Sequence, residues 1–295
     1  MHLFVTGANS FVGTHLRKAC EERAITCSGV DVTGPFTETI LECDIRDPGL
    51  ADLIPRGAVV VHLAAISRDS DCDANPEAAM SINIGGTANV ALAALDSAAT
   101  HVVFASSEWV YGRSPASDPL TEDMGPAWTD LNSLYAFSKA AGEEILRTQL
   151  VSRIPLSVLR FAIIYGPRAA NWSAFEYVVN AAREGSVSVG SAATSRRFIH
   201  VDDICAGILA AAETEGRELS VWNLAGPESL TLGRIAELTA NIVGIPVEVT
   251  ESNPLEPSVR DPSPDRMFAD IAWRAATDAA TGVSDVLDFL DGRRM

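Results

Sequence analysis

The first half of the chain alternates short runs of apolar, often β-branched residues with stretches in which apolar residues recur every three or four positions. This alternation predicts strands separated by helices. The run at 59–65 is apolar on both faces, which is typical of a parallel sheet covered by helices on both sides. The predicted strands are 3–6, 26–31, 39–43, 59–63, 102–106 and 156–164, and the predicted helices are 12–23, 51–54, 77–98 and 133–151. We expect a doubly wound α/β fold with a parallel sheet.

The pattern changes after Gly166-Pro167, where segments become shorter and richer in proline, with four prolines in 253–264. Helices are still predicted at 231–243 and 283–290, and a strand at 221–224. We therefore expect a first domain over 1–166, to which the chain returns at about 198–225, and a smaller mixed α/β domain over 167–295.

Composition excludes several classes of protein. With 47% hydrophobic and 21% charged residues, the chain can bury a sizeable core, so it is not disordered. The net charge of −17 disfavours nucleic acid and anionic membrane surfaces as partners. No apolar run approaches the roughly 18 residues of a membrane span, and the first residues enter a strand with no room for a signal peptide.

The cysteines and histidines carry no recognisable site. The five cysteines are odd in number and lack a CxxC spacing, and the five histidines show no paired ligand pattern. We expect reduced, mostly buried thiols, no metal and a cytoplasmic protein.

A glycine-rich segment, Thr6-Gly7-Ala8-Asn9-Ser10-Phe11-Val12-Gly13, follows the first predicted strand and opens the first helix. Glycines in such a turn let the backbone approach a pyrophosphate at the positive end of the helix. Asp31 ends the second strand, where a carboxylate accepts hydrogen bonds from ribose hydroxyls and repels a 2′-phosphate, which favours NAD over NADP. The simpler alternatives are a tight turn and a solvated aspartate.

Tyr135 and Lys139 are four residues apart and therefore share one face of the predicted helix 133–151. An ammonium favours the phenolate, which makes tyrosine a better general base. Lowering a phenol pKa from about 10 to about 7 takes roughly 4 kcal/mol. Ser107 follows the predicted strand 102–106, at the carboxyl end where α/β sheets bind ligands, and its hydroxyl can stabilise charge on a reacting oxygen. Alone, these would be an exposed helix pair and a polar strand end.

Taken in order, these residues resemble the extended short-chain dehydrogenase/reductase family, in its NAD-dependent epimerase/dehydratase branch. The resemblance runs from residue 2 to about 270 and includes His62-Leu63-Ala64-Ala65, Asp44-Ile45, Asn83-Ile84-Gly85-Gly86-Thr87 and Arg196-Arg197-Phe198-Ile199-His200-Val201-Asp202-Asp203. It implies a Rossmann domain that binds NAD and a C-terminal substrate domain.

The resemblance also implies roles for individual residues. The implied catalytic residues are Ser107, Tyr135 and Lys139. The implied NAD contacts are Gly7, Asn9, Ser10, Phe11, Val12, Gly13, Asp31, Asp44, Ile45, Leu63, Ala64, Ala65, Ser106, Tyr135, Lys139 and Phe161. The implied substrate contacts are Ser67, Ser107, Glu108, Trp109, Tyr135, Arg168, Arg196 and Arg266.

Several positions depart from the family pattern. Ser10 replaces the middle glycine of the loop, and Trp109 stands where family dehydratases carry a glutamate base, which argues against dehydration. Ile163 replaces an asparagine that contacts sugar nucleotides in many members, and Arg197 replaces a common aspartate. Arg196 and Arg266 nevertheless match arginines that bind substrate phosphates in the family.

The leading interpretation is a nucleotide-sugar 4-epimerase that acts by transient hydride transfer through a ketosugar. The alternative is net redox chemistry by a sugar or uronate dehydrogenase or a ketosugar reductase, because 130–135 resembles the approach to the tyrosine in uronate dehydrogenases. A catalytically silent NAD-sensing protein is a third interpretation, disfavoured because Tyr135 and Lys139 are both present. The resemblance further implies a homodimer formed through the helices 77–98 and 133–151.

Overall fold

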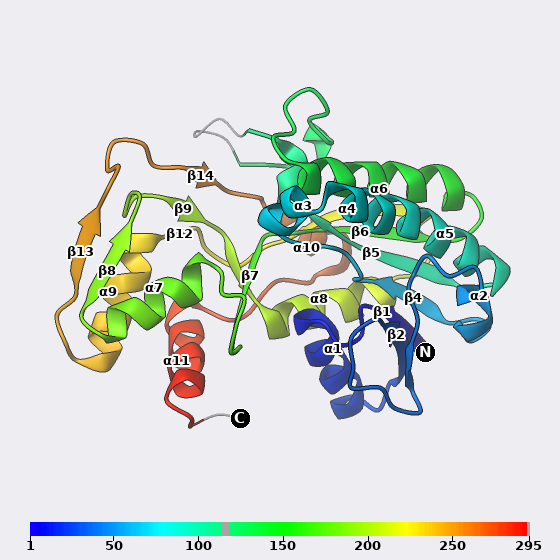
Figure 1. The fold of residues 1–295 in the computed structure, drawn as a ribbon, viewed down its shortest axis with the longest axis horizontal. Helices are drawn as coiled ribbons and strands as arrows, with labels where there is room; N and C mark the ends of the chain where they lie inside the picture. Colours follow the sequence, from blue (N-terminus) through cyan, green and yellow to red (C-terminus); the bar gives the residue numbers. More distant parts are fainter. Residues whose placement is uncertain (114–118, 294–295) are drawn as a thin grey trace. The chain divides into compact units, whose positions relative to one another are not determined.

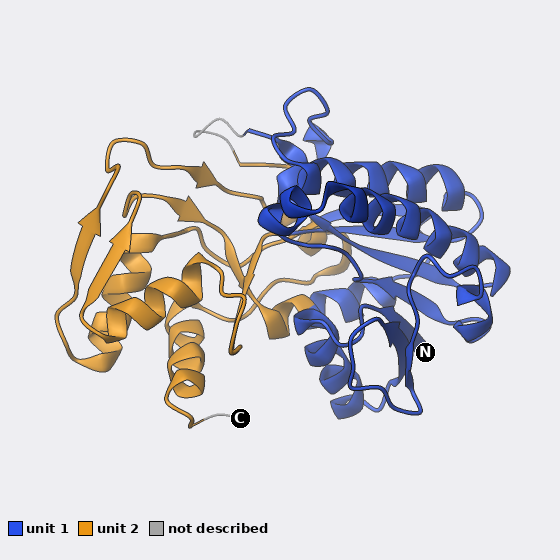
Figure 2. Ribbon diagram, in the orientation of Figure 1, with its two compact units in different colours: residues 1–113, 122–161, 205–222 blue, residues 114–121, 162–204, 223–295 orange. Residues whose placement is uncertain are grey.

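The structure, a computed structural model, describes residues 1–113 and 119–293. The chain forms two compact units (Figure 2). The first unit contains residues 1–113, 122–161 and 205–222. The second contains the described part of residues 114–121, together with residues 162–204 and the described part of 223–295. The chain leaves the first unit after Phe161, five residues before the predicted boundary, and returns to it at Cys205.

The first unit is built on a seven-stranded sheet with the order β11-β6-β5-β4-β1-β2-β3. Its strands are β1 (His2–Thr6), β2 (Thr26–Asp31), β3 (Ile40–Glu42), β4 (Val59–His62), β5 (His101–Ser107), β6 (Leu156–Phe161) and β11 (Leu219–Leu224). Neighbouring strands from β3 to β6 are parallel. The order reverses at β1, with β2 on one side and β4 on the other, so the expected doubly wound sheet is confirmed. Such a reversal opens a ligand-binding crevice at the carboxyl ends of the strands.

Helices cover both faces of this sheet. Figure 1 shows α5 and α6 on one face and α1 and α8 on the other. The helices are α1 (Phe11–Glu22), α2 (Leu50–Leu53), α3 (Asp69–Ala74), α4 (Pro76–Met80), α5 (Thr87–Asp96), α6 (Leu134–Leu150) and α8 (Val201–Ala212), with short 3-10 turns η2 (Glu108–Tyr111) and η3 (Glu122–Met124). Buried strand residues such as Phe4, Val60 and Phe104 pack against α5 and α6 residues in one apolar cluster.

The single helix predicted over 77–98 is three segments in the structure. It starts at Pro76 with Asn75 as its cap, and then passes through a π-helix, η1 (Ser81–Gly86), before α5 begins. The wider turn coincides with Gly86, where a Cβ would lie 2.4 Å from the Ile45 side chain. It also places Asn83 in a buried position, where its amide has specific partners.

The run Pro76–Asp96 is also apolar enough to span a membrane by length and composition, with a mean hydropathy of 1.3 over its best 18-residue window. The expectation that no such run exists was therefore wrong, because alanine, isoleucine, leucine and valine together with few charged residues make the run apolar on average. A helix that packs in the core of a folded unit passes the same test, and 44% of this window is buried in the fold. The run is weak evidence for a membrane span.

In the second unit, three of the four helices of the described residues pack around an apolar core. Its helices are α7 (Ala174–Arg183), α9 (Leu232–Val243), α10 (Asp265–Ile271) and α11 (Ala279–Leu290), and its strands are β7 (Ile163–Tyr165), β8 (Ser186–Val189), β9 (Ser195–Arg196), β10 (Phe198–His200), β12 (Leu230–Thr231), β13 (Glu248–Glu251) and β14 (Val259–Arg260). Phe175 of α7, Ile235 of α9 and Val283 of α11 are fully buried in its core. The strand predicted over 156–164 breaks at Ala162, whose N–H donates to Leu224 as the chain enters this unit.

Candidate active site

The glycine loop lies at the carboxyl end of β1, beside the strand-order reversal. Gly7 adopts a positive φ of 74°, and a Cβ there would lie 2.8 Å from the Ala64 nitrogen. A Cβ on Gly13 would lie 2.3 Å from the Gly7 carbonyl oxygen. Both glycines are therefore required for the close approach of the loop, the start of α1 and the chain after β4. This arrangement exposes the N-terminus of α1 to a ligand at the sheet edge.

Ser10 has a role that its place in the glycine pattern did not suggest. Its hydroxyl accepts a hydrogen bond from the Gly13 N–H at 3.0 Å, and it is the N-cap of α1. The substitution thus supplies a cap that a glycine lacks, and it uses one of the N–H groups that would otherwise face a phosphate.

Asp31 lies at the end of β2, next to this loop, as predicted. One carboxylate oxygen accepts the Asn9 N–H at 2.8 Å, and the other accepts the Thr33 N–H at 2.9 Å. The Asn9 amide group donates to the carbonyls of Thr33 and Pro35 at 2.6 and 3.0 Å, while its oxygen has no partner among the described residues. The carboxylate is held in a fixed orientation by two backbone donors and has acceptor capacity to spare.

Tyr135 and Lys139 lie on α6, in the first and second turns of that helix, which starts at the Ser133 cap. The Ser107 hydroxyl lies close enough to the Tyr135 phenol to lower its pKa. The Lys139 ammonium is 5.9 Å from the centre of the Tyr135 ring and donates to the Ala105 carbonyl at 2.7 Å. Ser107 ends β5, so all three predicted catalytic residues meet at one strand end.

Burial dominates the protonation of this group. It raises the pKa of Tyr135 to about 12, with the carboxylates of Asp69 and Glu108 adding to the effect and the Ser107 hydrogen bond opposing it. Burial also lowers the pKa of Lys139 to about 8, because the ammonium is almost completely removed from water. The chain alone therefore holds the phenol protonated at neutral pH, and a further positive charge is needed to make it a base.

Asn83, for which the sequence suggested no role of its own, connects α6 to the chain after β4. The Asn83 amide accepts from the Ile66 N–H at 2.8 Å and donates to the Ile66 carbonyl at 2.9 Å and to the Ser138 hydroxyl at 3.0 Å. Ser138 in turn donates to the Tyr135 carbonyl at 2.8 Å. An asparagine inside a largely apolar helical run predicts a buried amide with hydrogen-bond partners, so this residue could have been found from the sequence.

Ser106 faces a buried ion pair. Its hydroxyl donates to Glu143 at 2.5 Å, and Glu143 is paired with Arg160 at 2.8 Å. Arg160 also donates to the Tyr111 hydroxyl at 3.1 Å. The Ser106 hydroxyl has its only proton committed to a carboxylate, so it could meet a cofactor only as an acceptor, and its cofactor contact stays a prediction.

Two further predicted cofactor residues are engaged with the protein. The Asp44 carboxylate accepts from Arg46 at 2.9 and 2.6 Å, which lowers the pKa of Asp44. The Ile45 side chain is buried and its carbonyl accepts from Asn89 at 2.7 Å. The other predicted residues of this unit lie at the carboxyl ends of strands or at the start of α1: Phe11, Val12, Leu63, Ala64, Ala65, Ser67, Glu108, Trp109 and Phe161.

The predicted substrate arginines belong to the second unit. Arg168 forms an ion pair with the buried Glu176 at 2.7 Å. Arg196 donates to the carbonyls of Ser195 and Ser258 at 2.7 and 2.6 Å. Arg266 lies in α10 and is half-buried. Their part in phosphate binding stays a prediction.

Comparison with known proteins identifies the family of the chain. The model of the NAD-dependent epimerase/dehydratase family matches residues 3–225. The chain belongs to this family. Family membership establishes an enzyme of this class and confirms the resemblance drawn from the motifs.

Relatives within the family include UDP-glucuronate 4-epimerases of Arabidopsis thaliana. One is 28% identical over 83% of this chain and 61% of its own length, and another is 32% identical over 72% and 54%. The chain thus spans little more than half the length of these relatives. A dTDP-glucose 4,6-dehydratase of Streptomyces antibioticus is 26% identical over all of this chain and 93% of its own.

Solved structures share the fold over the whole chain. The UDP-glucuronic acid 4-epimerase of Bacillus cereus, crystallised with UDP-glucuronic acid and NAD, superposes with a TM-score of 0.84 at 24% identity, covering 100% of both chains. The UDP-glucose 4-epimerase of Thermus thermophilus in complex with NAD gives 0.84 at 22%, also covering 100% of both chains.

The residues present fit an NAD molecule. Gly7 and Gly13 form a cradle that a Cβ would fill, and Asp31 offers an oriented acceptor at the end of β2. The Asn9 oxygen is a buried acceptor without a partner in the described chain. Together these groups match a pyrophosphate and a ribose diol.

Proposed function

We propose that this protein is an NAD-dependent 4-epimerase of a nucleotide-linked sugar, working through a transient ketosugar. The buried Lys139 ammonium, 5.9 Å from the centre of the Tyr135 ring, together with Ser107 at the end of the adjoining strand β5, carries the proposal. NAD would be held by the loop at Gly7–Gly13, by Asp31 and by Lys139. Its oxidised nicotinamide ring would accept the hydride and supply a positive charge next to Tyr135.

Tyr135 acts as the base on the sugar hydroxyl at C4. Bringing its pKa from about 12 to about 7 takes roughly 7 kcal/mol of phenolate stabilisation. Lys139 contributes part of this through its ammonium, and Ser107 contributes a hydrogen bond. On the return step the ketosugar presents its other face, so that the hydride returns to the opposite side of C4 and Tyr135 gives the proton back to the C4 oxygen. Ser107 stabilises the oxygen while it carries charge.

Relatives and one departure support epimerisation over dehydration. Epimerases of UDP-glucuronate recur among the relatives. Trp109 occupies the position of the glutamate base of family dehydratases, so a base for water elimination is missing there. We therefore infer a UDP-linked uronate or hexose as the substrate class.

We also propose a homodimer in the cytoplasm. Apolar residues spaced four or eight positions apart run along two neighbouring helices, the 76–96 run with Met80, Ile84 and Leu92, and α6 with Phe137 and Ile145. Met80, Leu92 and Phe137 are each at least 42% exposed, which is costly for a monomer. All five cysteines are free thiols, in keeping with a reducing compartment.

Incubation with UDP-glucuronate tests the proposed activity. We expect UDP-galacturonate to appear, separated by chromatography, without net formation of NADH. Tyr135→Phe should lower turnover by about 10²–10⁴-fold because it removes the base. Tyr177→Phe, at an exposed tyrosine of α7, is the matched control and should be unchanged.

A parallel incubation with free glucuronate and NAD separates the alternative. Stoichiometric NADH accumulation there, with no isomerised nucleotide sugar in the first incubation, would establish a uronate dehydrogenase instead. Undiminished turnover in Tyr135→Phe would remove the assigned base.

A further inference from the structure

Two cysteine side chains lie next to each other at the turn between α1 and β2. Cys20 is in the last turns of α1 and fully buried, and Cys27 is on β2 and half-buried. The two thiols lie close enough for each to shift the pKa of the other. The Ile25 N–H donates to the Cys20 carbonyl at 2.8 Å, and Cys27 is in parallel register with Leu3. Regular structure therefore holds the two sulfur atoms side by side.

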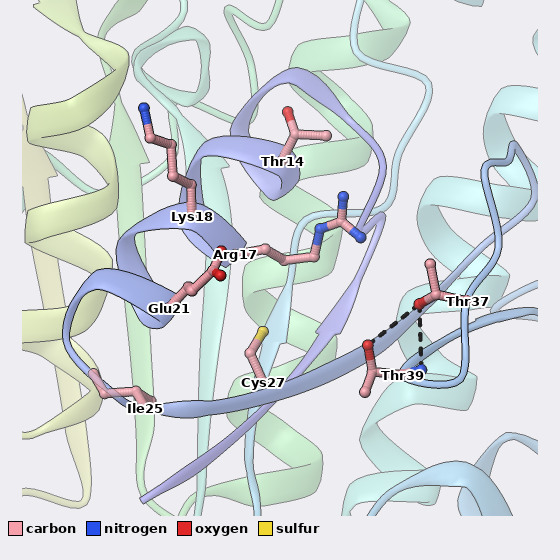
Figure 3. A pocket seen from close by; sticks show the side chains of 8 residues that line it. All are labelled: Thr14, Arg17, Lys18, Glu21, Ile25, Cys27, Thr37 and Thr39. Atoms are coloured by element: carbon pink, nitrogen blue, oxygen red, sulfur yellow. Dashed lines mark hydrogen bonds between the residues drawn. The ribbon is translucent and has the colours of Figure 1, made fainter.

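Cys27 faces a pocket of about 520 Å³ on the outer side of α1. Figure 3 shows its sulfur pointing into this pocket on the side of Arg17. The pocket is lined by Thr14, Arg17, Lys18, Glu21, Ile25, Cys27, Thr37 and Thr39. Two cations against one carboxylate make it locally basic in a chain whose net charge is −17.

The surroundings favour a thiolate within the pair. The hydrogen bond from Cys27 lowers the pKa of Cys20, and Arg23 acts in the same direction. The Arg17 guanidinium favours the thiolate form of Cys27, against burial and the hydrogen bond, which raise the pKa of Cys27. The pair therefore gives up a first proton more readily than an isolated thiol and holds the second more tightly.

We propose that Cys20 and Cys27 form a reversible thiol–disulfide site that exchanges with a small anionic disulfide of the glutathione type. The pocket admits the disulfide to Cys27, and Arg17 and Lys18 attract its carboxylates. Cys20 is shielded from solvent and resolves the mixed disulfide.

Each step of the exchange balances. The Cys27 sulfur attacks one sulfur of glutathione disulfide while its proton passes to the Cys20 thiolate, the disulfide bond breaks, and one glutathione leaves as thiolate. The Cys20 sulfur then attacks the Cys27 sulfur, and the second glutathione leaves. The proton of Cys20 goes to a departing thiolate, so two protein thiols are oxidised and one disulfide is reduced to two glutathione molecules.

Thiol counting on the full chain tests the site. After exposure to glutathione disulfide and denaturation, titratable thiols should fall from five to three per chain. Peptide mapping should find Cys20 joined to Cys27 within one chain, and a reductant should restore all five thiols. Five remaining thiols, a loss at Cys43 or Cys72, or a cross-link between chains would each overturn the proposal.

Single substitutions separate the two roles. In Cys20→Ser, Cys27 should retain one bound glutathione, because nothing resolves the mixed disulfide. In Cys27→Ser, neither adduct nor disulfide should form at Cys20. The half-buried Cys43, whose thiol donates to the Asp44 carbonyl, gives the matched control Cys43→Ser, which should form the disulfide as the parent does. A stable glutathione adduct on the unsubstituted protein would overturn the resolving role of Cys20.

The charge of the probe tests the pocket. Arg17→Gln should slow the reaction with glutathione disulfide several-fold, but leave that with the neutral bis(2-hydroxyethyl) disulfide less affected. Equal slowing of both reagents would overturn the part assigned to the pocket cations.

Discussion

Lys139 is buried, which disfavours its positive charge, yet the proposed reaction requires that charge beside Tyr135. The ammonium is 5% exposed and donates to the Ala105 carbonyl, 5.1 Å from the centre of the Phe104 ring. Its pKa is lowered to about 8, so the folded protein carries this charge at neutral pH at a cost in stability. The charge is retained because the phenolate of Tyr135 requires it, which makes the residue an example of stability given up for activity.

Removing this ammonium should stabilise the fold. Lys139→Met should raise the free energy of unfolding at pH 7 by about 1–3 kcal/mol, after allowing for the lost hydrogen bond to Ala105. Because the folded pKa is depressed, the gain is full below pH 8 and disappears as the pH rises toward 10.5, where the unfolded chain also loses the proton. Urea unfolding across this range measures it, with the exposed Lys18→Met as control. A destabilised variant at pH 7 would contradict the assignment.

Asp31 should decide the choice of cofactor. Asp31→Asn removes the charge that repels a 2′-phosphate, and the ratio of the Kd for NADP to that for NAD should fall by about tenfold or more, a change of about 1.4 kcal/mol. Fluorescence titration with both cofactors measures this ratio. Glu42→Gln, at the exposed end of the adjacent strand β3, is the control. An equal shift in both variants would show that Asp31 does not lie at the ribose.

Among the elements, α6 is fixed by contacts that join it to several strands. Glu143 on its inner side pairs with Arg160 of β6 and accepts from Ser106 of β5. Asn83 joins the same helix to the chain after β4. The catalytic residues therefore sit on a helix whose position is set by buried polar groups in addition to apolar packing.

Removing one partner of the Glu143–Arg160 pair should lower the free energy of unfolding much more than replacing both partners together. Arg160→Met leaves a buried carboxylate without its partner and should cost about 3–5 kcal/mol of unfolding free energy. Replacing both residues by methionine should recover most of this loss, because the buried charge is then gone as well. Chemical unfolding of the two single variants and the double variant tests the coupling. Additive losses would mean that the two charges do not depend on each other.

The elements that follow a strict period were predictable from sequence. The sheet of the first unit was anticipated strand by strand up to β6, and its central strands β1, β4, β5 and β6 are buried along most or all of their length. The π-helix was not, because a period of 3.6 was read through Asn83–Gly86, where packing against Ile45 imposes a wider turn. Helix α7 was missed although Ser173 and Glu176 form a capping box that was visible in the sequence.

The residues of the predicted site also fall into two groups, those that the sequence could place and those that needed the fold. Positions set by backbone geometry, such as Gly7, Gly13 and Asp31, could be placed by their spacing along one strand–turn–helix unit. The true partner of Ser106 could not, because Glu143 reads as half of an exposed acidic pair until the fold places it against β6.

For the whole molecule, the negative net charge and the exposed apolar residues of the 76–96 run and α6 have opposite effects on dimer formation. The net charge of −17 opposes self-association over the whole surface. The exposed Leu92 and Phe137 favour it at one face. The dimer should therefore tighten as salt is added, because salt screens the repulsion and leaves the apolar contact intact.

Sedimentation should reveal this dimer and its dependence on the helix face. Leu92→Glu should convert the protein to a monomer at micromolar concentration, because it would bury a carboxylate at the interface. The exposed Ile242→Glu on α9 is the control and should stay dimeric. A monomeric parent protein, or equal effects of both substitutions, would place the interface elsewhere.

Strand β11 has a consequence for how the protein is made. It completes the edge of the main sheet beside β6, yet it is encoded after residue 218, beyond much of the second unit. During synthesis, all six residues of β6 are available before their neighbour exists, and they form the most apolar unpaired edge of the nascent sheet. Until the ribosome has passed about sixty further codons, that edge is open to pairing with another chain. Slow translation or a stop before β11 should therefore favour aggregation over a stable fragment.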